Sequence, residues 1–188
     1  MAGWISLFVW LLAAAHSARP VPGAALASAK DHQIKAAYLF NFAKFVEWPK
    51  AVFADASSPI TIGVFGRDPF GGDLELMVRN KTAGGRKVEI KRFEQTEGLA
   101  ACQILFIPAV EEDRWPEIFA AIRNSTVLTV GETARFIEEG GIISLTPAGK
   151  KVGITIDIDA AERARLVLSS HLQNLAVIIR TGRPKQRK

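Results

Sequence analysis

One aromatic-rich segment, residues 34–49 (IKAAYLFNFAKFVEWP), constrains the fold more than any other part of the chain. Its periodicity predicts an α-helix that ends at Pro49, which has no amide hydrogen to donate to the helix. At helical spacing, one stripe carries four large apolar side chains: Ile34, Tyr38, Phe42 and Phe45. A stripe of this size needs a large partner surface, so we expect the helix to pack against a sheet.

The same helix carries a second aromatic stripe. Phe40 and Trp48 are expected on its opposite side, next to Lys44. Either a neighbouring segment of the same domain covers these two aromatics, or they form a partner or dimer surface, since rigid aromatic side chains anchor interfaces. The sequence leaves both interpretations open.

Short apolar runs alternate with helical segments through the middle of the chain. Strands are expected at residues 60–65, 88–93, 104–107 and 126–130, and helices are expected to begin at Asp68-Pro69, Trp115-Pro116 and Thr133. This alternation predicts one α/β domain, whose mostly parallel mixed sheet carries helices on both faces.

The C-terminal half adds a β-hairpin. Residues 142–145 and 152–158 are expected to pair around a turn at Pro147-Ala148-Gly149. A last helix is expected from Asp159, with Glu162 completing a capping box and Leu166 apart from the buried face. The residues expected on that buried face are Ala164, Leu168, Leu172 and Leu175. Residues 177–179 either extend this helix or form a final strand.

Charge is concentrated at one end of the chain. Five of the 24 Lys and Arg residues lie in the last nine positions, and the remaining cations equal the 19 Asp and Glu residues in number. A nucleic-acid binder would carry a distributed basic face, so this pattern argues against one. A basic tail of this kind is either solvated or contacts anionic lipid or an acidic partner.

The N-terminus has the pattern of an export signal. Residues 5–15 (ISLFVWLLAAA) form an apolar run too short to span a bilayer comfortably, and small residues follow it. Cleavage is expected after Ala27, with Ser17 as the alternative, although an uncleaved anchor is also compatible. We therefore expect a periplasmic protein with a signal peptide at 1–27, a domain at 28–179 and a basic flexible tail at 180–188.

Residues capable of catalysis are few. His16 lies in the leader, His32 at the start of the domain, and His171 on the expected apolar face of the last helix, where a core histidine is the default. The single cysteine, Cys102, opens an apolar strand and is expected to be a buried, inert thiol. Because no hydrolase or metal-binding motif is present, we expect no enzyme activity, no cofactor and no metal.

Two polar motifs have simpler structural explanations. The glycine-rich turn at residues 66–72 could hold phosphate on backbone amides, but Asp73 stands where a phosphate-binding loop needs Lys or Ser/Thr. Asp157 and Asp159 could form a weak cation site, but a helix cap with a solvated side chain explains them more simply.

An ordered set of segments resembles one known family. The set consists of the opening helix, the strand IGVFG followed by DPFG, the strand CQILFI, the segments VLTV and GGIISL, and the SSHL helix. In this order and spacing it resembles the YfiR-like family of small exported bacterial proteins. The resemblance extends from about Ile34 to Ala176.

The resemblance implies a periplasmic regulator, found as a dimer, that restrains an inner-membrane diguanylate cyclase by binding its periplasmic sensor domain. An outer-membrane lipoprotein that sequesters the regulator would release the cyclase and favour cyclic di-GMP synthesis and biofilm. Two positions depart from the family pattern. Cys102 stands alone where some relatives carry disulfide pairs, and Asp157 stands where the family tends to have Asn.

Two hypotheses follow for the functional surface. Under the regulatory hypothesis, the expected partner contacts are six residues with apolar or flanking positions: Phe40, Lys44, Trp48, Ile154, Ile156 and Leu166. Under the alternative, a periplasmic small-ligand-binding protein, the ligand would contact four residues at or near the glycine-rich turn: Arg67, Asp68, Gly71 and Arg86.

Overall fold

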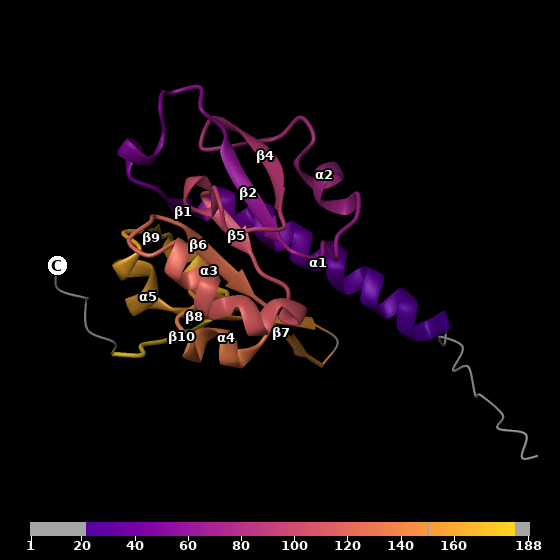
Figure 1. Ribbon diagram of the computed structural model, residues 1–188. Coiled ribbons are helices and arrows are strands. Elements are labelled where there is room, and N and C mark those ends of the chain that lie inside the picture. The colour runs from indigo at the N-terminus through magenta and orange to yellow at the C-terminus, as the bar shows by residue number, and fades with distance from the viewer. Residues whose placement is uncertain (1–21, 150, 183–188) are drawn as a thin grey trace, which may run out of the picture.

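The structure is a computed structural model that describes residues 22–149 and 151–182, with side chains from residue 30 onward. An eight-stranded sheet forms its centre (Figure 1). In sequence order, the strands are β2 (Ile60–Phe65), β3 (Thr82–Ala83), β4 (Arg86–Phe93), β5 (Ile104–Phe106), β6 (Leu128–Gly131), β7 (Ile143–Ala148), β8 (Lys151–Asp157) and β10 (Val177–Ile179). Their spatial order is β10-β8-β7-β6-β5-β2-β4-β3.

The sheet is mixed. The β7–β8 hairpin and the β3–β4 pair are antiparallel, and the other five neighbouring pairs are parallel. Strands β2, β4, β5, β6 and β7 follow the order 2-1-3-4-5 of doubly wound domains, which places the topological switch point between β2 and β5. The expected fold class, a single mostly parallel α/β domain with a late hairpin, is confirmed.

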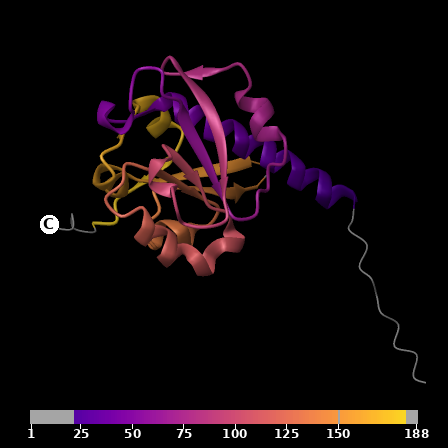
Figure 2. The same ribbon diagram turned by 45° about the horizontal axis from the view of Figure 1, so that its top comes forward.

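Helices cover both faces of the sheet. Figures 1 and 2 show α1 (Pro22–Phe45) along one face, with its N-terminal end extending beyond the body. Its residues Ala36, Leu39 and Phe42 belong to the larger core. On the other face, α3 (Trp115–Ala121) and α4 (Ala134–Glu138) contribute Trp115 and Phe136 to a second buried cluster.

Shorter elements complete the domain. They are α2 (Asp73–Val78), α5 (Ile158–Arg163), α6 (Ser170–Asn174), the 3-10 helices η1 (Lys50–Val52), η2 (Leu99–Ala101) and η3 (Ala109–Arg114), and a small sheet of β1 (Val46–Glu47) and β9 (Val167–Leu168). No helix in the two described ranges combines the length and hydrophobicity that a bilayer crossing requires. The expected signal sequence lies mostly outside these ranges, and the expected cleavage position after Ala27 falls within α1.

The opening helix differs from the prediction at both ends. It begins at Pro22, upstream of the segment 34–49, and it stops at Phe45, before Pro49. The backbone becomes extended there because Val46 and Glu47 pair with Leu168 and Val167. A contact with a segment more than 100 positions away in the chain ends the helix.

The predicted last helix is wrong. The chain instead forms α5, β9 and α6 in succession. Arg165, with φ 60°, ends α5: the amide of Leu166 donates to the carbonyl of Ala161, and that of Arg165 donates to Glu162. This is a Schellman ending, and β9 then pairs with β1. Residues 177–179 form a strand, which settles the alternative left open by the sequence.

One predicted helix start and one predicted turn also differ from the structure. Asp68 does not begin a helix: its Oδ1 accepts from the Phe70 amide at 2.7 Å, and α2 begins five residues later at Asp73. In the hairpin, Pro147 and Ala148 pair with Val152 and Lys151, so the turn is shorter than predicted. The strands expected at residues 60–65, 88–93, 104–107 and 126–130 overlap β2, β4, β5 and β6.

Candidate functional site

The residues proposed from sequence for partner contacts are mostly inside the core. Phe40, Ile154, Ile156 and Leu166 are at most 9% exposed, so the exposed apolar character expected of them is wrong. Ile154 and Ile156 lie on β8, whose neighbours β7 and β10 flank it on both sides. These four side chains offer little area to another protein.

The second aromatic stripe, Phe40 and Trp48, is covered by the chain itself. Trp48 is half-buried, and its Nε1 donates to the carbonyl of Gln103 at 3.1 Å. Lys44 is exposed, with its Nζ 5.9 Å from the centre of the Phe40 ring and 5.5 Å from that of Phe45. Of the two interpretations of this stripe, a covering segment of the same domain is the one that the burial supports.

The glycine-rich turn is closed by its own neighbours. Both carboxylate oxygens of Asp68 are engaged: Oδ1 accepts from Phe70, and Oδ2 lies 2.6 Å from Arg92. Arg92 also pairs with Glu75 at 2.6 Å, and this contact lowers the pKa of the Glu75 carboxyl. A Cβ added at Gly66 would collide with the side chain of Glu111. The Glu111 carboxylate therefore fills the space at the switch point.

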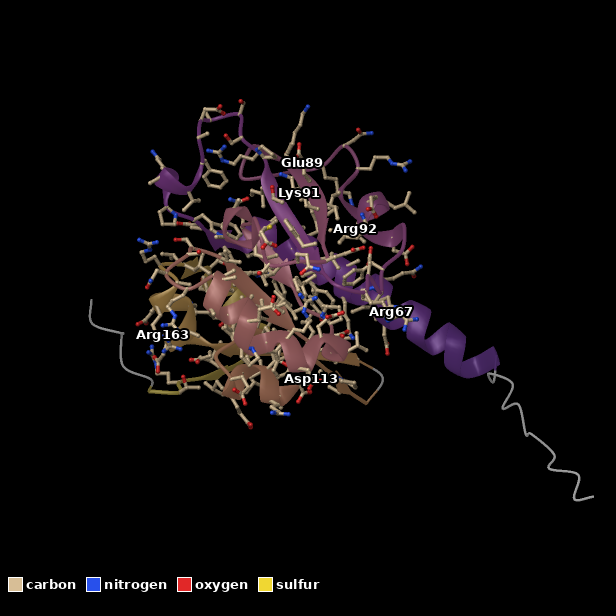
Figure 3. All side chains as sticks on the ribbon, viewed as in Figure 1. Arg67, Glu89, Lys91, Arg92, Asp113 and Arg163 are labelled. Atoms are coloured by element: carbon tan, nitrogen blue, oxygen red, sulfur yellow. The ribbon has the colours of Figure 1, made fainter. Side chains whose placement is uncertain are left out.

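The four residues of the ligand hypothesis do not come together. Arg67 is exposed beside the turn, and its backbone amide donates to Glu111 at 3.2 Å. Gly71 is also exposed there, with φ 56°. Arg86 lies at the opposite end of β4, where it donates to three loop carbonyls and stacks 3.8 Å from the centre of the Phe53 ring. Arg92, which sequence reasoning missed, is the cation at the turn (Figure 3).

The described residues with titratable nucleophiles or bases do not assemble into a site. Cys102 is buried as expected, and burial raises the pKa of its thiol to about 11. His171 is exposed rather than in the core, with its ring 4.7 Å from that of Phe45. Residues 22–149 and 151–182 contain no group of three or more His, Cys, Asp or Glu side chains that could hold a metal ion.

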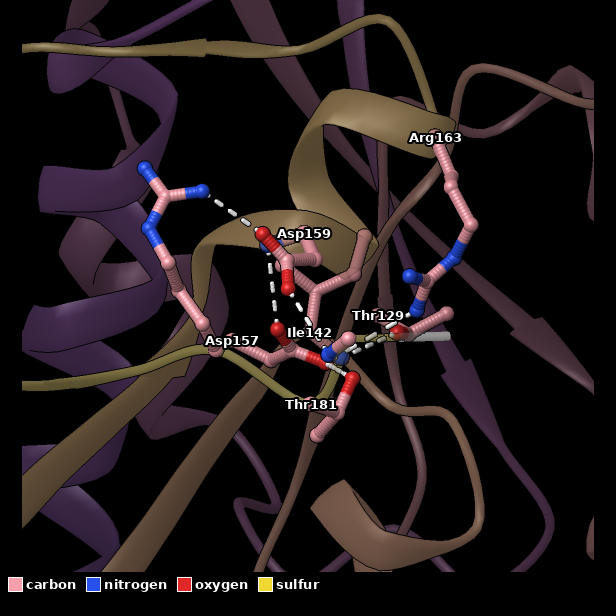
Figure 4. Close-up of polar contacts among 8 residues, drawn as sticks. Thr129, Ile142, Asp157, Asp159, Arg163 and Thr181 are labelled. Carbon is pink, nitrogen blue, oxygen red and sulfur yellow. Dashed lines mark hydrogen bonds and ion pairs between the residues drawn. The ribbon is translucent and has the colours of Figure 1, made fainter. Parts of the chain in front are cut away.

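Asp157, and not Asp159 as the sequence predicted, is the N-cap of α5, and its side chain is not solvated. It is fully buried; its Oδ1 accepts from the Asp159 amide at 3.0 Å, and its Oδ2 accepts from the Thr181 hydroxyl at 2.6 Å (Figure 4). Asp159 binds Arg180 at 2.6 Å and the Gly182 amide at 2.9 Å. These bonds fix residues 180–182 to the start of α5.

The exposed apolar side chains gather toward the C-terminus. Leu175, Val177 and Ile178 are 57%, 65% and 39% exposed, and they lie within the five positions before Arg180. We name these three residues the β10 patch. Val167 on β9 is exposed as well, whereas Leu76 and Val110 are single exposed residues on α2 and η3.

The β10 patch lies at an edge of the main sheet, and the two ends of the sheet differ in character. Near the opposite end, β4 exposes Lys87, Glu89 and Lys91, a charged pattern that discourages edge-to-edge pairing (Figure 3). Strand β10 carries no charge among its three residues and exposes two of them. A short, uncharged and apolar edge is a surface suited to another molecule.

Sequence reasoning missed this edge. The signal was present in the sequence, since LAVII at residues 175–179 is a run with no charged residue, directly before the basic tail. Only its assignment to an edge strand shows that the run is exposed rather than part of a buried helix face.

A groove of about 960 Å³ lies between α3, α4 and α5. Side chains of both charges line it, including Arg123, Arg165 and Glu162, together with Phe119 and Trp115. Among the residues that the structure describes, none accepts a hydrogen bond from the buried Nε1 of Trp115, so one indole donor beside the groove is left unsatisfied by them. The groove lies away from the glycine-rich turn, which contributes no residue to it.

These features define a single-domain α/β protein with a doubly wound mixed sheet and an apolar sheet edge. A family model described as YfiR/HmsC-like (DUF4154) matches residues 32–177, and the chain belongs to this family. The family resemblance inferred from the sequence is therefore confirmed. At the level of the family, the role is periplasmic regulation of diguanylate cyclase signalling.

Two solved structures show a distant likeness. One is a conserved domain protein from Vibrio cholerae O1 biovar El Tor, 12% identical with a TM-score of 0.47 over 63% of this chain and 54% of that chain. The other is the ABC domain in complex with L-Trp from Streptococcus pneumonia, 12% identical with a TM-score of 0.46 over 63% and 55%. The chain spans about half the length of these two proteins. None of the curated proteins matches.

Proposed function

We propose that this chain is a non-enzymatic periplasmic regulator that restrains an inner-membrane diguanylate cyclase by binding the cyclase's periplasmic sensor domain through the β10 patch. The observation that carries the proposal is the exposure of Leu175, Val177 and Ile178 at an uncharged sheet edge. Family membership supplies the kind of partner.

The physical mechanism is a shift in population. A sensor domain with two conformers is held in one of them only by a ligand that binds that conformer more tightly than the other. A hundredfold difference in affinity corresponds to about 2.7 kcal/mol, which burial of a few apolar side chains can supply. An outer-membrane lipoprotein that covered the same patch would compete with the cyclase and release it.

The decisive experiment measures binding of the purified periplasmic domain of the partner cyclase to wild type and to Val177→Asp. We expect the substitution to weaken binding at least tenfold, because a carboxylate would have to be desolvated at the interface. Leu76→Asp is the matched control, since Leu76 is 57% exposed but lies on α2. Equal losses in the two variants, or no loss in Val177→Asp, would refute the assignment of the patch.

The homodimer that the family resemblance implies is proposed to form through the same edge. Phe40 has only 9% of its surface exposed, and Trp48 is half-buried and hydrogen-bonded within its own chain, so neither offers a large dimer contact. Sedimentation equilibrium of wild type and Val177→Asp tests this point. A dimer that persists unchanged in Val177→Asp places the dimer contact elsewhere.

A second candidate function, binding of a small ligand, is supported by the groove between α3, α4 and α5. The unsatisfied Nε1 of buried Trp115 is the specific observation that favours it. A thermal-shift screen with small periplasmic metabolites tests it, because a ligand present at 100 times its dissociation constant stabilises the fold by about 2.7 kcal/mol. A shift that survives in Trp115→Phe would show that this indole donor does not bind the ligand.

A further inference from the structure

We infer that the groove between α3, α4 and α5 binds a short peptide with a free amino terminus and a free carboxyl terminus, held by opposite charges at its two ends. The inference rests on the second candidate function, binding of a small ligand, and names the chemical class of that ligand. Three observations carry it: how charge is distributed along the groove, how far apart its charged ends lie, and what lines its middle.

The end of the groove beside η3 is acidic. Three carboxylates line it: Glu112, Asp113 and Glu139. The lining cation that contacts them is Arg135, which binds Glu112 and lies 3.7 Å from Glu139. Asp113 is exposed and forms no ion pair with any residue that the structure describes. Three carboxylates beside one guanidinium leave this end negative, so it suits the ammonium group of a ligand.

The end of the groove where α3 finishes is basic. Three guanidinium groups line it, together with the carboxylate of Glu162: those of Arg123, Arg163 and Arg165. Glu162 lies 3.6 Å from Arg180, and Arg163 lies 3.7 Å from Asp157. The other two guanidinium groups, those of Arg123 and Arg165, therefore decide which ligand group fits this end.

These two guanidinium groups keep their charge. Arg165 donates to the carbonyl of Asn124 and to the hydroxyl of Thr126, both at 3.1 Å and both neutral acceptors. Arg123 is exposed, and within the described part of the chain it has no carboxylate partner. Because Arg165 binds the residue that follows Arg123, the two cations belong to the same end of the groove. They suit a carboxylate, which accepts charge-assisted hydrogen bonds from guanidinium groups.

The two charged ends are separated by the length of α3. Asp113 stands two positions before the helix begins at Trp115, and Arg123 stands two positions after it ends at Ala121. Figure 3 shows Asp113 and Arg163 toward opposite ends of this helix. A helix of seven residues is about 10 Å long, and three residues of extended peptide also span about 10 Å. A free amino acid, whose ammonium and carboxylate groups share one carbon, is too short to reach both ends.

The middle of the groove suits the body of a peptide. Phe119, Ile122 and Ile142 supply apolar lining, and no described residue accepts a hydrogen bond from the buried Nε1 of Trp115. A peptide offers both apolar side chains and carbonyl acceptors. The volume of about 960 Å³ lies within the usual range for small-molecule sites. A ligand of one charge sign would be repelled by one of the two ends, so a molecule with separated opposite charges fits best.

Calorimetric titration of the exported chain, purified as the cell processes it, with the tripeptide alanyl-leucyl-alanine tests the inference. We expect binding of the free tripeptide and about tenfold weaker binding of its N-acetylated and C-amidated forms, because each capped form loses one charge-assisted contact. Free leucine, which has the same central side chain, is expected not to bind.

Substitutions show which end holds which terminus. Arg123→Gln is expected to weaken binding of the free tripeptide about tenfold and to leave binding of the C-amidated form unchanged, since that contact is already missing there. Asp113→Asn is expected to act in the same way toward the N-acetylated form. Lys91→Gln and Glu89→Gln, at exposed positions on β4, remove one charge of each sign outside the groove and are the matched controls.

Three results would overturn the inference: no binding of the free tripeptide at millimolar concentration, equal affinity for free and capped forms, and equal losses in Arg123→Gln and Lys91→Gln. Failure of ligand binding in general is distinguishable. A compound from the thermal-shift screen that stabilises wild type but not Arg123→Gln, with no binding of the tripeptide, would keep the groove as a ligand site and refute the peptide. The regulator proposal is tested separately, because Arg123→Gln is expected to bind the cyclase sensor domain as wild type does.

Discussion

At the scale of single residues, Asp157 illustrates how one buried carboxylate connects three parts of the chain. It ends β8, caps α5 through the Asp159 amide and accepts a hydrogen bond from Thr181. Arg163, at 3.7 Å, supplies the opposite charge. A buried carboxylate is tolerated only with such partners, so this position is structural rather than a cation site.

Replacement of Asp157 tests that role. Asp157→Ala removes the N-cap and leaves the Thr181 hydroxyl without its acceptor, so we expect the free energy of unfolding to fall by about 3 kcal/mol. Asp157→Asn keeps an oxygen acceptor and should lose less. Urea denaturation measures both, with Asp113→Ala, an exposed position on η3, as a control expected to stay at the wild-type value. A wild-type midpoint for Asp157→Ala would contradict the assignment.

Cys102 predicts a pH dependence at the alkaline end. Burial raises the pKa of this thiol from 9.0 to about 11, so the folded state holds the proton more tightly than the unfolded chain. Its stabilising contribution is complete below pH 9 and is lost as pH rises toward 11, up to about 3 kcal/mol in total. At pH 8 only about one thiol in a thousand should be ionised, so native Cys102 should resist labelling.

The measurement compares the free energy of unfolding of wild type and Cys102→Ala from pH 7.5 to 10.5. The comparison cancels the titration of lysines, which both chains share. We expect the advantage of wild type to shrink as pH rises through this window. A constant difference, or rapid labelling of the native thiol at pH 8, would show that the thiol is not desolvated.

Sequence reasoning at this scale succeeded for residue types and failed for positions. It identified Cys102 as a buried thiol because the segment around it is apolar, and the structure agrees. It assigned Arg86 to the glycine-rich turn, but β2 and β4 run parallel, so Arg86 and the turn lie at opposite ends of the strands. The register of β2 against β4 is a long-range property, and it brings Arg92 rather than Arg86 to Asp68.

At the scale of elements, α4 is held by a close fit between one ring and two glycines. Phe136 is fully buried, and its ring lies where a Cβ on Gly131 or Gly141 would be, at 2.3 and 2.2 Å. The Gly141 amide also donates to the Phe136 carbonyl at 2.8 Å, which ends α4 in a Schellman motif. The glycines are needed here for space.

Substitution at this contact should therefore be costly. Gly141→Ala would place its methyl group inside the Phe136 ring and close to its carbonyl, and we expect the loss of about 3 kcal/mol that overpacking produces. Gly72→Ala is the matched control, because Gly72 has negative φ and no atom within 4 Å of an added Cβ. Thermal unfolding of both variants is the measurement. A similar melting temperature for the two would refute the close fit.

The C-terminal elements show which part of the fold the local pattern could not supply. Apolar residues at helical spacing from Ala164 to Leu175 predicted a single helix, yet Leu175 is 57% exposed and β9 interrupts the run. Strand β9 exists because β1 pairs with it, and that pairing joins segments distant in sequence. The alternating strands and helices of residues 60–145 were predictable because each element there has a strong local signal.

At the scale of the whole molecule, the described contacts define which residues the domain needs. On α1, the first residue in the buried core is Ala36. Just before it, the Nζ of Lys35 lies 2.5 Å from a carboxylate oxygen of Glu132. At the other end, Thr181 and Gly182 bind Asp157 and Asp159. The expected N-terminal boundary at Ser28 leaves these contacts intact, whereas the expected C-terminal boundary at Ile179 removes two of them.

Truncated chains test these boundaries. A chain of residues 28–182 keeps the described bonds of Arg180, Thr181 and Gly182 to Asp157 and Asp159, so it is the reference for the shorter chain. A chain of residues 28–179 loses the bonds to Asp157 and Asp159, and its free energy of unfolding should fall by about 2 kcal/mol. If the two truncated chains proved equally stable, residues 180–182 would not be part of the domain.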